Sequence, residues 1–323
     1  MNSPVNSPAT IPACPGPLEP NRPKNPPPPK ACDTHAHVFG PSDCFAYSGD
    51  RSYTPPDAPL AKYLGMLGTL GFERGVLVQG SAHGRDNSAM LDALERTPDR
   101  LRGVAVADES VSPAELRRWD KLGVRALRFN HFFRGGQLHY RCGVTLDTAK
   151  TLAPQMKDLG WHLQLWIDCK DMPETIPILD AIGLPVLIDR MGRTDARTGT
   201  GTPGFQSLLR YVGDGRGWVK VSGAHRLSNN APDFRRRNRS MRRWCGPTRS
   251  GSCGAATGRI RASRARCRTP ATSTSCSTTG RRMPTCDARS SSTIRPGFTG
   301  FRVRPFDATT PIPTLRRRSA PRS

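Results

Sequence analysis

Lysine is absent and acidic residues are nearly absent from the last part of this 323-residue sequence. Residues 235–323 contain 22 arginines, no lysine and two aspartates, a balance of +20 within a net charge of +23 for the whole chain. The preceding residues therefore carry only +3, which is ordinary for an enzyme. A strongly basic chain suggests nucleic-acid binding, but here that interpretation applies only to the basic segment.

The sequence also lacks paired cysteines and long apolar runs. Its ten cysteines form no C-x-x-C pair and no regular pattern, which argues against a zinc ribbon or a disulfide framework. No segment approaches the roughly 18 apolar residues of a membrane span, and no leader of secretory type is visible at the N-terminus. We therefore expect no membrane partner and a reducing, cytoplasmic setting.

Large apolar residues are scarce in residues 1–30, which are dense in proline. Such a segment cannot bury a core, so we expect a disordered or polyproline arm. The sequence then divides into this arm, an enzyme-like domain over residues 31–234 and the arginine-rich tail over 235–323.

Short apolar runs recur through the middle of the chain, separated by longer segments with helical spacing. Each run stays apolar until its last residues, as expected of a parallel strand covered on both faces. Strands that alternate with helices form βαβ units, so the fold class is α/β. We predict strands over 31–39, 74–81, 102–108, 123–130, 162–168, 185–192 and 218–224. We predict helices over 59–71, 87–100, 112–123, 145–160, 173–183 and 204–213, with a capping box of Ser112 and Glu115 opening the third.

Seven strands are one fewer than a (β/α)8 TIM barrel needs to close. In a complete barrel the eighth strand and its closing helix would follow residue 224. The arginine-rich sequence there shows no strand pattern, so we expect both to be missing. In such barrels the chemistry lies at the carboxyl ends of the strands. The polar residues there are His35, His37, Gln79, Ser81, Asp108, Arg128, Asp168, Arg190, Arg193, Ser222 and His225. The alternative is that some of them, such as Asp108 and Asp168, only cap strands or pair with loop backbone.

The stretch "DTHAH" ends the first predicted strand. Its two histidines, His35 and His37, are two residues apart, so their side chains share one face of the strand. Two imidazoles at the mouth of a barrel suit a divalent metal ion or a polarised carbonyl group.

Five stretches together resemble the amidohydrolase superfamily, in the branch that contains 2-pyrone-4,6-dicarboxylate lactonase. They are "DTHAHVFGP", "VLVQGSAHGRDN", "VRALRFN" with the following Arg134, "IDRMGR" and "WVKVSGAHR". The resemblance runs from about residue 31 to 228 and implies a barrel of amidohydrolase type.

The resemblance also implies roles for individual residues. Arg128, Arg134 and Arg193 would hold substrate carboxylates, which suits the guanidinium fork. Tyr53 and Ser81 would add hydrogen bonds to the same groups. The catalytic histidines would be His35 and His37, which would polarise the scissile carbonyl or hold one zinc-like divalent metal ion. Some members of the branch work without a metal, so no cofactor is fixed. The partner is a small carboxylated lactone.

Two departures from the branch stand out. Arg190 stands in "DRMGR" where the branch has a histidine, and a guanidinium cannot ligate a metal ion. It would either line the site or turn out to solvent. The motif "GSDWPH", whose aspartate is the general base of the branch, is absent altogether.

A shifted reading frame accounts for the tail. Codons exist that encode "SCGAATGRIR" (residues 252–261) in one frame and "VWGSDWPHP" in the next. In the same way "MRRWCGPTRSGS" permits "ALVRANPERIV", and "STIRPGFTGF" permits "DNPARLYGF". Three stretches recover the missing region in order, so we interpret residues 235–301, and the remainder after them, as an out-of-frame translation.

We therefore expect a hydrolase that opens a carboxylated lactone by attack of water on its carbonyl group. The present chain should be inactive and poorly soluble because the general base and the closing strand are lost. A metal-dependent hydrolase acting on a different acid is an alternative within the family. The alternative from another class is a basic protein whose arginine-rich tail binds nucleic acid.

Overall fold

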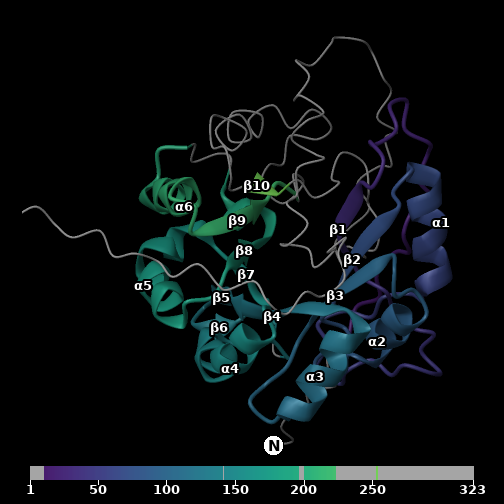
Figure 1. The fold of residues 1–323 in the computed structure, drawn as a ribbon, viewed down its shortest axis with the longest axis horizontal. Coiled ribbons are helices and arrows are strands. Elements are labelled where there is room, and N and C mark those ends of the chain that lie inside the picture. Colours follow the sequence, from purple (N-terminus) through teal and green to yellow (C-terminus); the bar gives the residue numbers. More distant parts are fainter. Residues whose placement is uncertain (1–10, 141, 196–199, 223–251, 254–323) are drawn as a thin grey trace, which may run out of the picture.

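The computed structural model describes residues 11–140, 142–195, 200–222 and 252–253. Its main feature is a curled parallel sheet in which neighbouring strands follow one another along the chain (Figure 1). Seven of its strands are β1 (Cys32–Ala36), β2 (Arg74–Val78), β3 (Leu101–Ala105), β4 (Val124–His131), β7 (His162–Ile167), β8 (Val186–Ile188) and β9 (Gly217–Lys220). All seven predicted strands are confirmed, and with them the TIM-barrel class.

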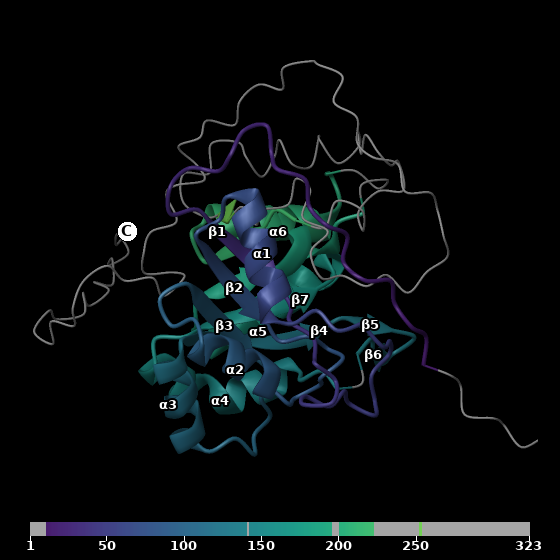
Figure 2. The same ribbon diagram turned by 90° about the vertical axis from the view of Figure 1, so that its right-hand side faces the viewer.

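Helices cover the outer side of this sheet, and Figure 2 shows α1 lying against β1 and β2. They are α1 (Leu60–Leu70), α2 (Ser88–Glu95), α3 (Pro113–Leu122), α4 (Leu146–Asp158), α5 (Met172–Ile182) and α6 (Pro203–Gly213). The predicted cap of α3 is present, because the backbone N–H of Glu115 donates to Ser112 Oγ at 3.1 Å. Within the described ranges, no helix has both the length and the apolar character needed to cross a bilayer.

Apolar side chains pack on both faces of the strands. The large cluster lies between sheet and helices and includes Leu77, Leu127 and Leu163, all fully buried. A smaller cluster lies on the other face of β1 to β4 and consists of Cys32, Val76, Val78, Val104 and Ala126. Burial on both faces explains why the strands are continuous apolar runs in the sequence.

The expected closing strand is missing among the described residues, although a short strand lies beside β9. A two-residue strand, β10 (Ser252–Cys253), pairs in parallel with β9, Ser252 opposite Val219. The sheet order ends at β1 on one side and β10 on the other, with no pairing between them among the described residues. A short strand therefore takes the eighth place without joining the ends of the sheet.

We expected a disordered or polyproline arm, but within residues 11–30 the arm makes backbone contacts with the barrel domain. Cys14 N–H donates to the carbonyl of Thr54 at 2.9 Å, and Thr54 N–H donates to that of Pro12 at 2.9 Å. Pro27 lies against Gly71 at the end of α1. Backbone pairing and ring packing hold these residues on the barrel without a core of their own. The first ten residues and most of the tail lie outside the described residues.

Candidate active site

The two histidines of "DTHAH" lie side by side at the carboxyl end of β1. Their ring centroids are 5.1 Å apart and the rings are perpendicular. His37 Nδ1 lies 2.7 Å from the carbonyl oxygen of Val78, so this nitrogen carries the proton that it donates. The prediction that both imidazoles face the same side is confirmed.

A register irregularity between Asp33 and Ala36 changes which way β1 presents its polar side chains. Asp33 accepts a hydrogen bond from the Tyr63 hydroxyl of α1 at 3.2 Å, on the outer side of the sheet. His35, two residues later, contacts Lys220 of β9 instead. The irregularity therefore allows one strand to anchor a helix and to supply the site.

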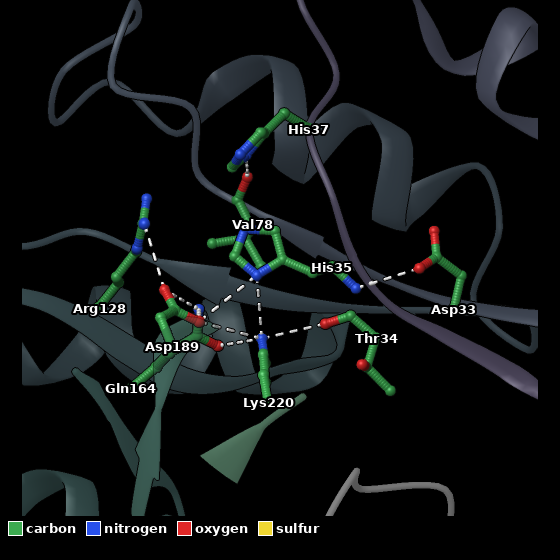
Figure 3. Close-up of polar contacts among 9 residues, drawn as sticks. All are labelled: Asp33, Thr34, His35, His37, Val78, Arg128, Gln164, Asp189 and Lys220. Carbon is green, nitrogen blue, oxygen red and sulfur yellow. Dashed lines mark hydrogen bonds and ion pairs between the residues drawn. The ribbon is translucent and has the colours of Figure 1, made fainter. Parts of the chain in front are cut away.

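His35 is part of a buried polar cluster that joins five elements (Figure 3). We define this cluster as His35, Arg128, Gln164, Asp189 and Lys220. Asp189 accepts hydrogen bonds from Arg128 Nη2 at 3.2 Å and from Gln164 Nε2 at 3.1 Å. Lys220 Nζ donates to Gln164 Oε1 at 2.8 Å and lies 3.2 Å from His35 Nδ1. It also donates to the backbone carbonyl of Thr34 at 3.0 Å.

Charge in the cluster is strongly biased toward cations. Burial raises the pKa of Asp189, but the positive charges of Lys220 and Arg128 outweigh burial and hold that pKa well below its ordinary value. Burial, and then the ammonium of Lys220, lower the pKa of His35 well below its ordinary value. At neutral pH the cluster therefore contains one carboxylate, two cations and a neutral imidazole.

An aromatic cluster of Phe132, Tyr140 and Trp166 lies beside the polar cluster. Three guanidinium groups approach the face of Trp166, with Cζ to ring centroid distances of 5.7 Å for Arg128, 5.6 Å for Arg190 and 5.8 Å for Arg193. Arg193 also lies 4.2 Å from the Phe132 ring centroid. Cation–π contacts of this kind help to hold arginine side chains in place.

Arg190 and Arg193 belong to a turn, η2 (Asp189–Arg193), in which the backbone is left-handed. The φ angles of Arg190, Met191 and Arg193 are +55°, +54° and +53°. Such a turn is costly for residues with a Cβ atom and is typical of functional sites. Arg190 is only 4% exposed, so the alternative in which it turns out to solvent is wrong.

The other predicted substrate-binding residues lie nearby on different elements. Ser81 Oγ donates to the Tyr53 hydroxyl at 3.2 Å, so the structure brings these two residues together. Arg134 lies in β5 (Phe133–Arg134), which forms a hairpin with β6 (Gln137–Leu138) directly after β4. Gly135 and Gly136 form its turn, with φ angles of +56° and +75°.

Several polar residues at strand ends have structural roles. Gln79 donates to the carbonyls of Gly84 and Asp86 and so shapes a loop. Asp108 accepts from the backbone and hydroxyl of Ser110, and Asp168 caps η1 (Cys169–Asp171). For these three the simpler interpretation, strand and loop capping, holds. Ser222 follows β9, while His225 and the position of the family's general base lie outside the described residues.

The donor set fits a divalent metal poorly. In the described ranges no group of three or more histidine, cysteine, aspartate or glutamate residues is placed to hold one. His35 Nδ1 faces an ammonium group, and Asp189 is already paired with Arg128. We therefore derive no step of the chemistry through a metal ion.

Sequence reasoning missed Gln164, Trp166, Asp189 and Lys220. The first two alternate along β7, a period that would have placed both on the inner face. Lys220 stands in an otherwise apolar strand, which is itself a signal because lysine is almost never fully buried without partners.

Comparisons with known proteins identify the family of this chain. The family model described as Amidohydrolase matches residues 32–249. A 2-pyrone-4,6-dicarboxylate hydrolase from Comamonas testosteroni is 36% identical over 66% of this chain and 68% of its own. A 4-sulfomuconolactone hydrolase from Hydrogenophaga intermedia is 35% identical over 64% of this chain and 67% of its own. The crystal structure of a probable 2-pyrone-4,6-dicarboxylic acid hydrolase from Acinetobacter baumannii, with citric acid bound, is 31% identical with a TM-score of 0.56, covering 67% and 77% of the two chains.

Proposed function

The chain belongs to the amidohydrolase family and is a hydrolase of the lactonase type, and on this premise we propose that its substrate is a small lactone carrying carboxylate groups. We choose 2-pyrone-4,6-dicarboxylate as the first compound to test. The proposal agrees with the names of two relatives, both of which act on anionic lactones.

The observation that carries the proposal is the gathering of Arg128, Arg190 and Arg193 around Trp166, next to His35 and His37. Arg128 is shared with Asp189, and the guanidinium groups of Arg190 and Arg193 lie against the ring of Trp166. Guanidinium groups held against aromatic faces bind planar carboxylates in a bidentate manner. The flat aromatic surface also suits a planar lactone ring.

The reaction that fits this arrangement is addition of water to the lactone carbonyl. The water oxygen bonds to the carbonyl carbon, the ring C–O bond breaks, and the product is an open chain with one more carboxylate. In this reaction His35 would supply a hydrogen-bond donor to the carbonyl oxygen as it gains negative charge, and such a donor stabilises the transition state. The cationic surroundings favour a more anionic product and the anionic transition state that precedes it.

The base that would accept the water proton is not identified among the described residues. Asp189 is a weak base because it pairs with Arg128, Gln164 and Lys220. The shifted frame supplies an aspartate shortly after residues 252–253, and these are the residues that pair with β9 as β10. We infer that the active enzyme has the shifted frame and that the present chain is slower by about 10²–10⁴-fold, the usual contribution of a general base.

The test is a spectrophotometric assay of ring opening with the present chain and with a chain restored to the shifted frame. We expect the restored chain to open 2-pyrone-4,6-dicarboxylate and the present chain to be much slower. In the restored chain Arg193→Met should raise KM at least tenfold, whereas Arg117→Met, an exposed arginine of α3, should leave KM unchanged. A folded restored chain that opens no anionic lactone would refute the proposal.

The alternative of a different acid substrate is tested in the same assay. A panel should include 4-sulfomuconolactone and neutral ester analogues of each compound. The nucleic-acid alternative concerns residues outside the described ranges, and no structural observation favours it.

A further inference from the structure

The strongest unexplained feature beside the proposed chemistry is the ammonium group of Lys220. This side chain is 1% exposed and comes from the last residue of β9. Its Nζ reaches three acceptors on different elements: Gln164 Oε1 at 2.8 Å, the Thr34 carbonyl at 3.0 Å and His35 Nδ1 at 3.2 Å (Figure 3). Burying a lysine side chain is costly, so a buried lysine at this position calls for a role.

The contact with His35 has a chemical direction. A lysine ammonium has only donors and no acceptor. At His35 Nδ1, therefore, Lys220 donates, and the ring nitrogen must supply its lone pair. A neutral imidazole has one N–H, so the proton of His35 lies on Nε2.

One neighbour favours the opposite arrangement. Asp189 Oδ1 lies 3.5 Å from His35 Nδ1 and would accept a proton from it. This distance is longer than the 3.2 Å to Lys220 Nζ, and Asp189 already accepts from Arg128 and Gln164. Two groups thus compete for one nitrogen, and the ammonium is the closer.

The other nitrogen of the ring completes the argument. His35 Nε2 is buried and has no hydrogen-bond partner among the described residues. A buried N–H without a partner is costly and is uncommon in a native structure. At a candidate active site, the simplest explanation is a donor that waits for a substrate oxygen.

We propose that Lys220 is a positioning residue that fixes the tautomer of His35, so that Nε2–H donates a hydrogen bond to the lactone carbonyl oxygen. The substrate part of this inference rests on the proposed function. In the opposite tautomer Nε2 would present a lone pair, which repels a carbonyl oxygen and would suit a metal ion instead. Lys220 therefore decides whether His35 acts as a hydrogen-bond donor or as a ligand.

Nuclear magnetic resonance tests this directly on the full chain. Histidine is labelled with ¹⁵N, and long-range ¹H–¹⁵N correlations report which ring nitrogen carries the proton; the His35→Gln variant assigns the His35 signals. We expect the Nε2–H form in the unmodified chain. Finding the Nδ1–H form would overturn the inference without any variant, whether or not the variants fold.

Two substitutions separate positioning from mere structural support. Lys220→Met removes the donor, so His35 should change to the Nδ1–H form and donate to Asp189. Lys220→Gln keeps an N–H donor without the charge and should retain the Nε2–H form. Lys62→Met, on the exposed side of α1, is the matched control and should leave the His35 signals unchanged. A folded Lys220→Met variant with an unchanged tautomer would overturn the inference.

Kinetics on the frame-restored chain complete the test. Loss of one oxyanion donor lowers kcat by about 10²–10³-fold, with little effect on KM. We expect this pattern for Lys220→Met and partial recovery in Lys220→Gln. If the tautomers behave as expected but no lactone is opened, the proposed function is wrong while the Lys220–His35 pairing stands. If lactone is opened but Lys220→Met has the same kcat as the frame-restored chain without this substitution, the inference on Lys220 is wrong.

Discussion

Replacement of Asp189 by asparagine should be one of the most destabilising single polar changes in this protein. Asp189 is fully buried, and it is the only carboxylate among the described residues within ion-pair distance of Arg128 and Lys220. Asparagine has nearly the same size but no charge, so both buried cations would lose the carboxylate that pairs with them. Breaking a buried ion pair in this way typically costs about 3–5 kcal/mol.

That cost is large compared with the whole stability of a domain, which is about 5–15 kcal/mol. For a urea dependence of about 2 kcal/mol per M, Asp189→Asn should lower the unfolding midpoint by roughly 1.5–2.5 M. Urea unfolding followed by tryptophan fluorescence measures this shift, because Trp161 and Trp166 are both buried.

Asp92→Asn is the matched control. Asp92 pairs with Arg96 at 3.3 Å on the surface of α2, and its side chain is 41% exposed. An exposed i,i+4 pair contributes only about 0.3–0.5 kcal/mol, so the midpoint should hardly move. If Asp189→Asn cost less than about 1 kcal/mol, the buried cluster would not depend on its central charge, and this reasoning would be refuted.

Three further predictions concern pH, binding and metal. Burial raises the pKa of Asp33 from 3.8 to about 6, despite its bonds from the His35 backbone and Tyr63, so the fold loses stability as pH rises through this window. Asp33→Asn should therefore be more stable at pH 8 by up to about 3 kcal/mol, with no advantage by pH 4; equal differences at both pH values in urea unfolding would contradict this. Tyr53→Phe removes the acceptor of the Ser81 hydrogen bond and should raise KM two- to tenfold, the value of one hydrogen bond, without lowering kcat in the lactone assay. Dialysis of the restored chain against a chelator should leave its activity unchanged, since its described donors suit a metal poorly; stoichiometric zinc whose removal abolishes activity would contradict this.

The fold was predictable because its signals are local. Each of the seven strands is an apolar run that ends at polar residues, and helices separate them, three of which end at a glycine in the left-handed conformation. Six of the seven predicted strands were too long at their carboxyl ends, while the strand predicted over 123–130 runs one residue further, to His131. The run 185–192, for example, becomes a strand only to Ile188, where the left-handed turn η2 begins. Periodicity cannot reveal such a turn, since neither arginine nor methionine favours it.

The site was only partly predictable because its parts are far apart in the sequence. The resemblance found His35, His37 and the arginines, each next to a recognisable motif. It did not find that Asp189 and Lys220 meet His35, contacts that span 154 and 185 residues. The curl of the sheet creates those contacts. Lysine in an apolar strand and aspartate after one were the available signals, and they become informative only once the strands are arranged in a barrel.

The charge arrangement bears on where the general base of the proposed reaction would come from. A base for water must combine a suitable pKa with freedom from strong cationic partners. Among the carboxylates at the carboxyl ends of the described strands, Asp189 is held ionised by Arg128 and Lys220, while Asp108 and Asp168 are engaged with loop groups. His35 is a donor in the proposed tautomer. In the proposed reaction the site would bind an anion and polarise its carbonyl, and we expect the carboxylate that completes it to come from after β9, where the proposed shifted frame would supply an aspartate.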